Sequence, residues 1–213
     1  SWILCGIFFQ APDKSLVNAG GSAAKSGTSE MKQYTSGEMM RTRNFYLLLA
    51  TMFFGLISYF MVSPVSQTYQ IDLGIPSAVA VSAVMLGSIV NAGARLVLPT
   101  LADKVGRIVC IKGVLIVAVI AMGVLAVSRS LAVTIAIVLM YGCYGGIMGS
   151  FPSLTSSIFG MKHTGENYGF VMFGIVFATF GAPAISGLVS SNGYEMNVVF
   201  GIGAVFAVIA FVC

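Results

Sequence analysis

Six long apolar runs, separated by short polar connections, dominate the pattern of hydrophobic and polar positions along the chain. The runs cover residues 44–65, 76–98, 108–127, 131–150, 168–189 and 196–213. Each approaches the roughly 20 apolar residues that an α-helix needs to cross a bilayer. Because the connections are short, consecutive helices must run antiparallel. The pattern therefore predicts an all-α membrane protein in which residues 44–213 form a bundle of six transmembrane helices.

The first 43 residues follow a different pattern. Residues 1–9 form a short apolar run, which we interpret as the end of a preceding transmembrane helix. Residues 10–43 are rich in Gly, Ser, Ala and charge, and they bury too little apolar surface to offset the entropy lost on ordering. We expect a flexible interdomain loop there, with a regulatory docking segment as the alternative. Because the chain opens and closes inside apolar runs, we also expect a fragment of a longer protein.

Composition agrees with a membrane protein. Of the 213 residues, 57% are hydrophobic and only 8% are charged, whereas soluble domains carry about 25% charged residues. Such a chain cannot cover its surface with polar groups, so we expect the lipid bilayer to be its main solvent. The net charge of +4 comes from loop residues and gives no reason to expect a nucleic-acid partner.

The positions of lysine and arginine predict the orientation in the membrane, because cytoplasmic loops carry an excess of both. Nine of the eleven lie on one side: Lys14, Lys25, Lys32, Arg41, Arg43, Lys104, Arg107, Lys112 and Lys162. Arg129 lies on the other side, and Arg95 lies within a run. The loops at 10–43, 99–107 and 151–167 are therefore expected to be cytoplasmic.

The residue types that most often carry catalysis or bind metals are isolated in this sequence. The four cysteines lie in or beside apolar runs without paired spacing, which is typical of small buried hydrophobes. The single histidine, His163, is expected to be a solvated loop residue, and Glu195 a residue at the membrane interface. We find no nucleophile–base pair, metal cluster or phosphate-binding loop in the sequence, so we expect neither enzymatic activity nor a metal or cofactor.

A charged motif, Pro99-Thr100-Leu101-Ala102-Asp103-Lys104-Val105-Gly106-Arg107, connects the second and third runs. Asp103 is placed to cap the following helix, and Lys104 and Arg107 are placed to pair with carboxylates or helix C-termini. Ordinary loop charges are the alternative. The motif resembles the cytoplasmic Gly-x-Leu-x-Asp-Lys/Arg-x-Gly-Arg signature of the major facilitator superfamily, with Pro99 in place of the first glycine. This resemblance implies the C-terminal half of a twelve-helix fold, whose N-terminal half is absent from this chain, and a cytoplasmic gate motif of Asp103, Lys104, Gly106 and Arg107.

Arg95 lies within the second run, about 12 Å deeper along a helix than Asp103. An arginine there costs about 2.5–3.5 kcal/mol on a lenient insertion scale, so it must face protein or a water-filled cavity. Its planar guanidinium suits capture of a carboxylate, whereas a link to Asp103 or snorkelling to the cytoplasm is the alternative. The spacing Asn91-x-x-x-Arg95 resembles the Asp-x-x-x-Arg helix of monocarboxylate transporters, whose arginine binds the substrate carboxylate. Asn91 stands at the position of the aspartate in that motif, and its amide side chain cannot titrate.

A third motif precedes the fifth run, where Phe159-Gly160-Met161-Lys162 leads to Asn167-Tyr168-Gly169. It resembles the loop before the eleventh helix in the oxalate/formate antiporter family, as does Phe151-Pro152-Ser153-Leu154. The resemblance implies carboxylate transport. The oxalate carrier of that family has a lysine a few residues after Asn-Tyr-Gly, but here no Lys or Arg follows Lys162. We therefore expect a monocarboxylate, a small organic anion, carried by alternating access.

Polar side chains within the runs complete the predicted substrate site. It comprises Arg95, Asn91, Tyr59, Tyr141 and Tyr144, with Ser63 and Thr179 as further candidates. Hydrogen bonding to a neighbouring helix is the alternative role for each of them. For the whole chain, the alternatives are a non-transporting membrane receptor or scaffold and a facilitator-type transporter of a hydrophobic solute.

Glycines at helical spacing predict where two helices approach closely. Gly142 and Gly146, and Gly145 and Gly149, are four residues apart within the fourth run. Without a β-carbon, such a face lets a neighbouring backbone pack directly against it. We expect this face to lie against another helix and not against lipid.

Overall fold

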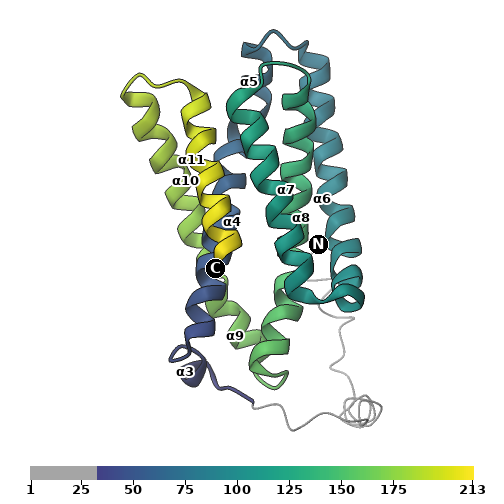
Figure 1. The fold of residues 1–213 in the computed structure, drawn as a ribbon, viewed down its shortest axis with the longest axis vertical. Helices are drawn as coiled ribbons and strands as arrows, with labels where there is room; N and C mark the ends of the chain where they lie inside the picture. Colours follow the sequence, from purple (N-terminus) through teal and green to yellow (C-terminus); the bar gives the residue numbers. More distant parts are fainter. Residues whose placement is uncertain (1–32) are drawn as a thin grey trace, which may run out of the picture. The chain divides into compact units, whose positions relative to one another are not determined.

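Each apolar run folds into a helix. The computed structural model describes residues 33–213, and this part of the chain contains helices and no strand (Figure 1). The elements are α3 (Ser36–Met39), α4 (Arg43–Val62), the 3-10 turn η1 (Ser63–Val65), α5 (Ser66–Asp72), α6 (Ser77–Val105), α7 (Arg107–Val127), α8 (Ala132–Phe159), α9 (Thr164–Val171), α10 (Phe173–Ser191) and α11 (Met196–Val212).

Among residues 33–213, five segments are long and apolar enough to cross a membrane: Arg43–Asp72, Ser77–Val105, Arg107–Val127, Ala132–Phe159 and Thr164–Ser191. The last helix, α11, is apolar but shorter, with 17 residues. The prediction of an all-α membrane fold is confirmed: five of the six predicted helices have the length of a span, and the sixth, α11, is shorter.

Two of the spans contain a break. Pro64 lies in η1, between α4 and α5, where its missing N–H and its ring interrupt the helical hydrogen bonds. Met172 separates α9 from α10 without a proline. It lies between Gly169 and Gly174, and glycine is a poor helix former, so an interruption costs little there. The span thus divides into the short helix α9 and the longer helix α10.

The predicted glycine face of α8 lies against α6. A β-carbon at Gly149 would lie 2.8 Å from the backbone oxygen of Arg95, and one at Gly145 would overlap the backbone oxygen of Asn91. A β-carbon at Gly146 would overlap the side chain of Leu98. Only glycine allows this approach, so the prediction of a helix contact is confirmed. The two backbones meet at the segment of α6 that carries the predicted site.

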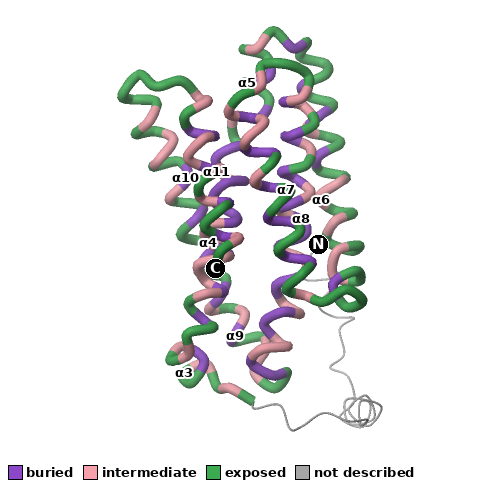
Figure 2. The backbone as a smooth tube through the Cα atoms, in the orientation of Figure 1, coloured by how far each residue is buried: buried purple, intermediate pink, exposed green. Residues whose placement is uncertain are grey.

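The exposed side of the bundle is apolar. Figure 2 shows exposed residues along the outer sides of α6 and α10, and these include Ile89, Leu96 and Phe180. The interior is also apolar, with Leu56, Phe151 and other large side chains fully buried. Apolar groups on both the inside and the outside are expected when hydrocarbon replaces water as the solvent.

Residues 33–40 differ from the expected flexible loop. The amide of Tyr34 donates to the carbonyl of Phe159 (2.9 Å), and Met39 is fully buried. The expectation of a segment without contacts is therefore wrong for these residues. Composition could not reveal the contacts, because most of them use backbone groups. The expected helix end at 1–9 and the remaining loop, 10–32, lie outside the described residues.

Candidate functional site

Arg95 projects from α6 and is held by neutral groups. Its Nε donates to the amide oxygen of Asn91, one turn earlier, at 3.2 Å. Its guanidinium carbon lies 5.5 Å from the centre of the Tyr144 ring, at a distance suited to a cation–π contact. Among residues 33–213, no acidic side chain forms an ion pair with Arg95. Its positive charge is oriented by the protein but is not neutralised by it.

Three tyrosines from α4 and α8 form an aromatic cluster beside Arg95. The rings of Tyr59 and Tyr144 stack, with centres 4.2 Å apart and planes 14° from parallel. Tyr141 meets Tyr59 edge to face at 5.3 Å, and Phe60 meets Tyr144 at 6.0 Å. The structure thus brings together all five residues predicted for the substrate site.

The close packing of α6 and α8 explains this arrangement. Tyr144 precedes Gly145, the residue against which the backbone of Asn91 packs. A β-carbon at Gly87 of α6 would lie 3.0 Å from the ring of Tyr141, so this ring also fills space left by a glycine. Tyr144 and Arg95 are therefore brought within reach by the same helix contact.

Hydroxyl groups fix two of the tyrosines. Ser63 donates to the Tyr59 hydroxyl at 3.3 Å, and the hydroxyls of Ser66 and Tyr141 share a hydrogen bond of 3.4 Å. Ser63 thus belongs to the cluster. Thr179, the other further candidate, is exposed on α10 and donates to the carbonyl of Ile175 in its own helix. The structure gives Thr179 no contact with the cluster.

Tyr168 joins the site although we did not predict it. It is half-buried in α9 and close enough to interact electrostatically with Arg95 and Tyr144. The signal was available in the motif Asn167-Tyr168-Gly169, which we used for the family resemblance without assigning a role to the tyrosine. Its proximity depends on the position of α9, which the turn at Gly160 separates from α8.

The gate motif has a different geometry from the predicted one. Asp103 does not cap α7: the cap position is Gly106, with a positive φ of 110° and no side-chain hydrogen bond. Asp103 instead pairs with Arg107, four residues later, at 3.2 Å. The prediction of a cap is wrong because the glycine turn places Asp103 before the cap position, one helical turn from Arg107.

Arg107 has a second partner, since it donates to the carbonyl of Ser153 in α8 at 2.8 Å. It therefore joins the α6–α7 turn to α8. Lys104 is exposed in the last turn of α6, where its charge is favourable for the helix dipole. Asp103 pairs with Arg107 and Arg95 bonds to Asn91, so the alternative of an Arg95–Asp103 link does not describe this structure.

Four other titratable residues pair with each other away from Arg95. His163 Nδ1 lies 3.9 Å from a carboxylate oxygen of Glu166, and Arg129 pairs with Glu195 at 2.7 Å. Within the described part of the chain, no cluster of His, Cys, Asp and Glu side chains could hold a metal ion.

The apolar groove between α6, α7 and α8 does not suit an anion. Its volume is about 430 Å³, and none of its lining side chains carries a charge. Val90, Leu98 and Val117 are among the side chains that line it. A carboxylate placed there would lose its hydration without gaining a cation or a donor. The groove is therefore no rival to the cluster around Arg95.

Comparison with known proteins agrees with the resemblances found in the sequence. The chain is 27% identical to the oxalate:formate antiporter of Oxalobacter formigenes over 183 residues, which cover 84% of this chain and 44% of that protein. It is 33% identical over 146 residues to a protein of Escherichia coli (strain K12) named "Uncharacterized MFS-type transporter YhjX", covering 67% of this chain and 36% of that one. The chain thus spans less than half the length of these curated relatives. Residues 2–180 match the family model of the Major Facilitator Superfamily. The chain therefore belongs to the Major Facilitator Superfamily, a family of membrane transporters.

Proposed function

We propose that this chain is the C-terminal six-helix half of a carrier that moves a small carboxylate across a membrane by alternating access. In this mechanism, two halves rock about a site near the bilayer midplane. The observation that carries the proposal is Arg95, a cation within a span whose direct contacts in residues 33–213 are Asn91 and the ring of Tyr144. A substrate carboxylate would offset the cost of that charge.

The neutral partners suit reversible binding of an anion. Asn91 occupies one donor of the guanidinium, which leaves four of its five N–H groups for other acceptors. The ring of Tyr144 holds the guanidinium from one side without cancelling its charge. A carboxylate can therefore form a bidentate pair with Arg95 and leave again, because no buried ion pair must be broken first.

The number of cations favours a monocarboxylate. Lys112 lies in the second turn of α7, and its Nζ lies 5.8 Å from the centre of the Phe211 ring. It belongs to α7, away from the tyrosine cluster. No Lys or Arg follows Lys162, so α9, α10 and α11 supply no second positive charge. We infer that this half neutralises one carboxylate, with formate as the simplest probe.

We place the gate motif and the loops at 10–43, 99–107 and 151–167 on the cytoplasmic side. The support is the distribution of lysine and arginine, since excess positive charge stays on that side. The Asp103–Arg107 pair and the Arg107–Ser153 bond would then brace α6, α7 and α8 at the cytoplasmic end.

The test is uptake of radiolabelled formate and oxalate by the intact protein in proteoliposomes. Arg95→Gln should lower formate uptake by about 100-fold, because a charged hydrogen-bonded contact is lost. Insertion should be equal or better, since an expensive charge has gone. Lys112→Gln, the matched control, also removes a cation from a span and should transport normally. Normal formate uptake by Arg95→Gln would contradict the role proposed for Arg95. Absence of formate and oxalate uptake by the wild type would favour a receptor, a scaffold or a carrier of hydrophobic solutes.

A further inference from the structure

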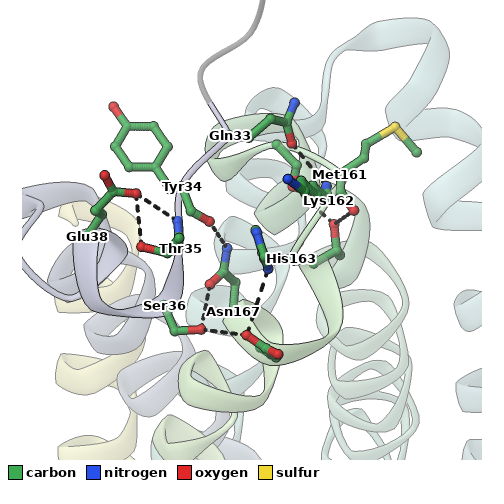
Figure 3. Close-up of polar contacts among 12 residues, drawn as sticks. Gln33, Tyr34, Thr35, Ser36, Glu38, Met161, Lys162, His163 and Asn167 are labelled. Atoms are coloured by element: carbon green, nitrogen blue, oxygen red, sulfur yellow. Dashed lines mark hydrogen bonds and ion pairs between the residues drawn. The ribbon is translucent and has the colours of Figure 1, made fainter.

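Residues 33–40, which we call the docking segment, bind to the connection between α8 and α9 (Figure 3). Besides the Tyr34–Phe159 backbone bond, the amide of Lys162 donates to the side-chain oxygen of Gln33 at 3.0 Å. The ring of Tyr34 meets Phe159 edge to face, 5.8 Å between centres. Both ends of the connection are therefore held by the segment that precedes α4.

Gly160 makes this docking possible. Its φ of 88° lies in the left-handed region, which residues with a β-carbon rarely adopt. A β-carbon at this position would also overlap the side chain of Gln33. The glycine thus serves both the turn after α8 and the approach of the docking segment.

Asn167 of α9 is the central contact. It is fully buried, and both ends of its amide bond to the docking segment: Nδ2 donates to the carbonyl of Tyr34 (3.1 Å), and Oδ1 accepts from the Ser36 hydroxyl (3.2 Å). The Ser36 hydroxyl also lies 3.3 Å from the carboxylate of Glu166. Losing the docking segment would break both of these hydrogen bonds and uncover the amide.

The residue that follows Asn167 is Tyr168, whose electrostatic partners are Arg95 and Tyr144. The short helix that carries both residues, α9, is bounded by Gly160 on one side and by the break at Met172 on the other. The turn at Gly160 separates α9 from α8, whereas helical hydrogen bonds continue through Met172 into α10. Contacts at the first turn of α9 therefore help to set its position. The docking segment supplies such a contact through the buried side chain of Asn167, whose amide is hydrogen-bonded at both ends.

We propose that the docking segment fixes the position of α9 and thereby keeps Tyr168 within electrostatic range of Arg95, so that the chain preceding α4 influences the anion site. The proposal rests on the carboxylate function proposed above. Asn167 is a positioning residue, since it acts through Tyr168. The interdomain loop would change the affinity of the site by docking or undocking.

Two variants break the contact from opposite sides. Asn167→Asp keeps the shape but cannot donate to Tyr34, and it adds a charge near Glu166. Ser36→Ala removes the hydroxyl from the docking segment. The matched control is Ser157→Ala, because Ser157 lies on α8 near the same connection but donates only to Leu154 in its own helix. Ser36→Ala remains informative if Asn167→Asp does not fold.

Hydrogen–deuterium exchange of the intact protein measures the coupling without any substrate. In Asn167→Asp, exchange in peptides covering 33–42 and 164–171 should be about 10-fold faster, and both regions should change together. Ser36→Ala should produce a smaller change in the same two regions, and Ser157→Ala none. Faster exchange in 33–42 with unchanged exchange in 164–171 would overturn the proposal, because α9 would then hold its position without the docking segment.

The half-saturating concentration of formate supplies the functional measurement. It should rise by about 3- to 10-fold in Asn167→Asp, and this rise should disappear in a Tyr168→Leu background if Asn167 acts through Tyr168. Additive effects of the two substitutions would contradict a positioning role. If the wild-type protein binds neither formate nor oxalate, the proposed carboxylate function is wrong. Hydrogen–deuterium exchange in residues 164–171 still tests whether the docking segment fixes the position of α9.

Discussion

Two arginines, Arg95 on α6 and Arg107 at the start of α7, show how differently one side chain can be used in the same bundle. Arg107 pairs with a carboxylate and a carbonyl, so the protein itself satisfies its charge. Within residues 33–213, Arg95 has neutral partners: it contacts the amide of Asn91 and the ring of Tyr144, and Tyr59 and Tyr168 lie within electrostatic range. A satisfied charge joins helices, whereas an oriented but unneutralised charge attracts an anion. The partners of a charge therefore indicate its role better than its position along the chain.

The largest expected difference comes from replacing each arginine by lysine. Arg95→Lys keeps the charge but loses the planar guanidinium, which can bind a carboxylate through two N–H groups. The half-saturating concentration of formate should therefore rise by about 10-fold. Arg107→Lys should leave this concentration within about 2-fold, because the Asp103 pair is largely exposed and contributes under about 1 kcal/mol. Uptake kinetics of the two variants, measured side by side, provide the test. Equal losses of affinity would remove the distinction between the two sites.

The glycine contact between α6 and α8 should have the next largest effect, on folding and not on affinity. Gly146→Leu places a large side chain where Leu98 already packs, so we expect about 1–3 kcal/mol of destabilisation and a lower folded yield. The control is Gly123→Leu on α7, since a β-carbon at Gly123 meets no atom within 4 Å. Fluorescence-detected size exclusion after heating would measure both variants. Equal stability would show that α6 and α8 do not need this close approach.

The smallest effect concerns the ring beside Arg95. Tyr144→Leu removes the cation–π contact, worth about 0.5–2 kcal/mol, and should weaken formate binding by about 3- to 10-fold. Tyr144→Phe keeps the ring and should bind formate within about 2-fold of the wild type. The same uptake assay separates the two variants. Equal losses in both would assign the role to the hydroxyl and not to the ring.

The sequence predicted the spans well because run length and polarity follow directly from the thickness of the bilayer. It also predicted the residues around Arg95. The glycine packing of α6 and α8 brings Asn91, Tyr141 and Tyr144 close to it, and α4 adds Tyr59. Tyr168 was missed because its position depends on the break at Met172, which no proline marks. The docking of residues 33–40 was missed because backbone hydrogen bonds leave no periodic pattern. The pairing of Asp103 depended on the turn at Gly106, which spacing alone could not specify.

The most direct test of the central claim is the binding isotherm of formate to the purified intact protein and to Arg95→Gln and Arg107→Gln. If Arg95 is the anion-binding charge, formate should bind to the wild type and to Arg107→Gln with similar affinity. Its affinity for Arg95→Gln should fall by about 100-fold. Unchanged formate affinity in Arg95→Gln, with the protein folded, would contradict the account.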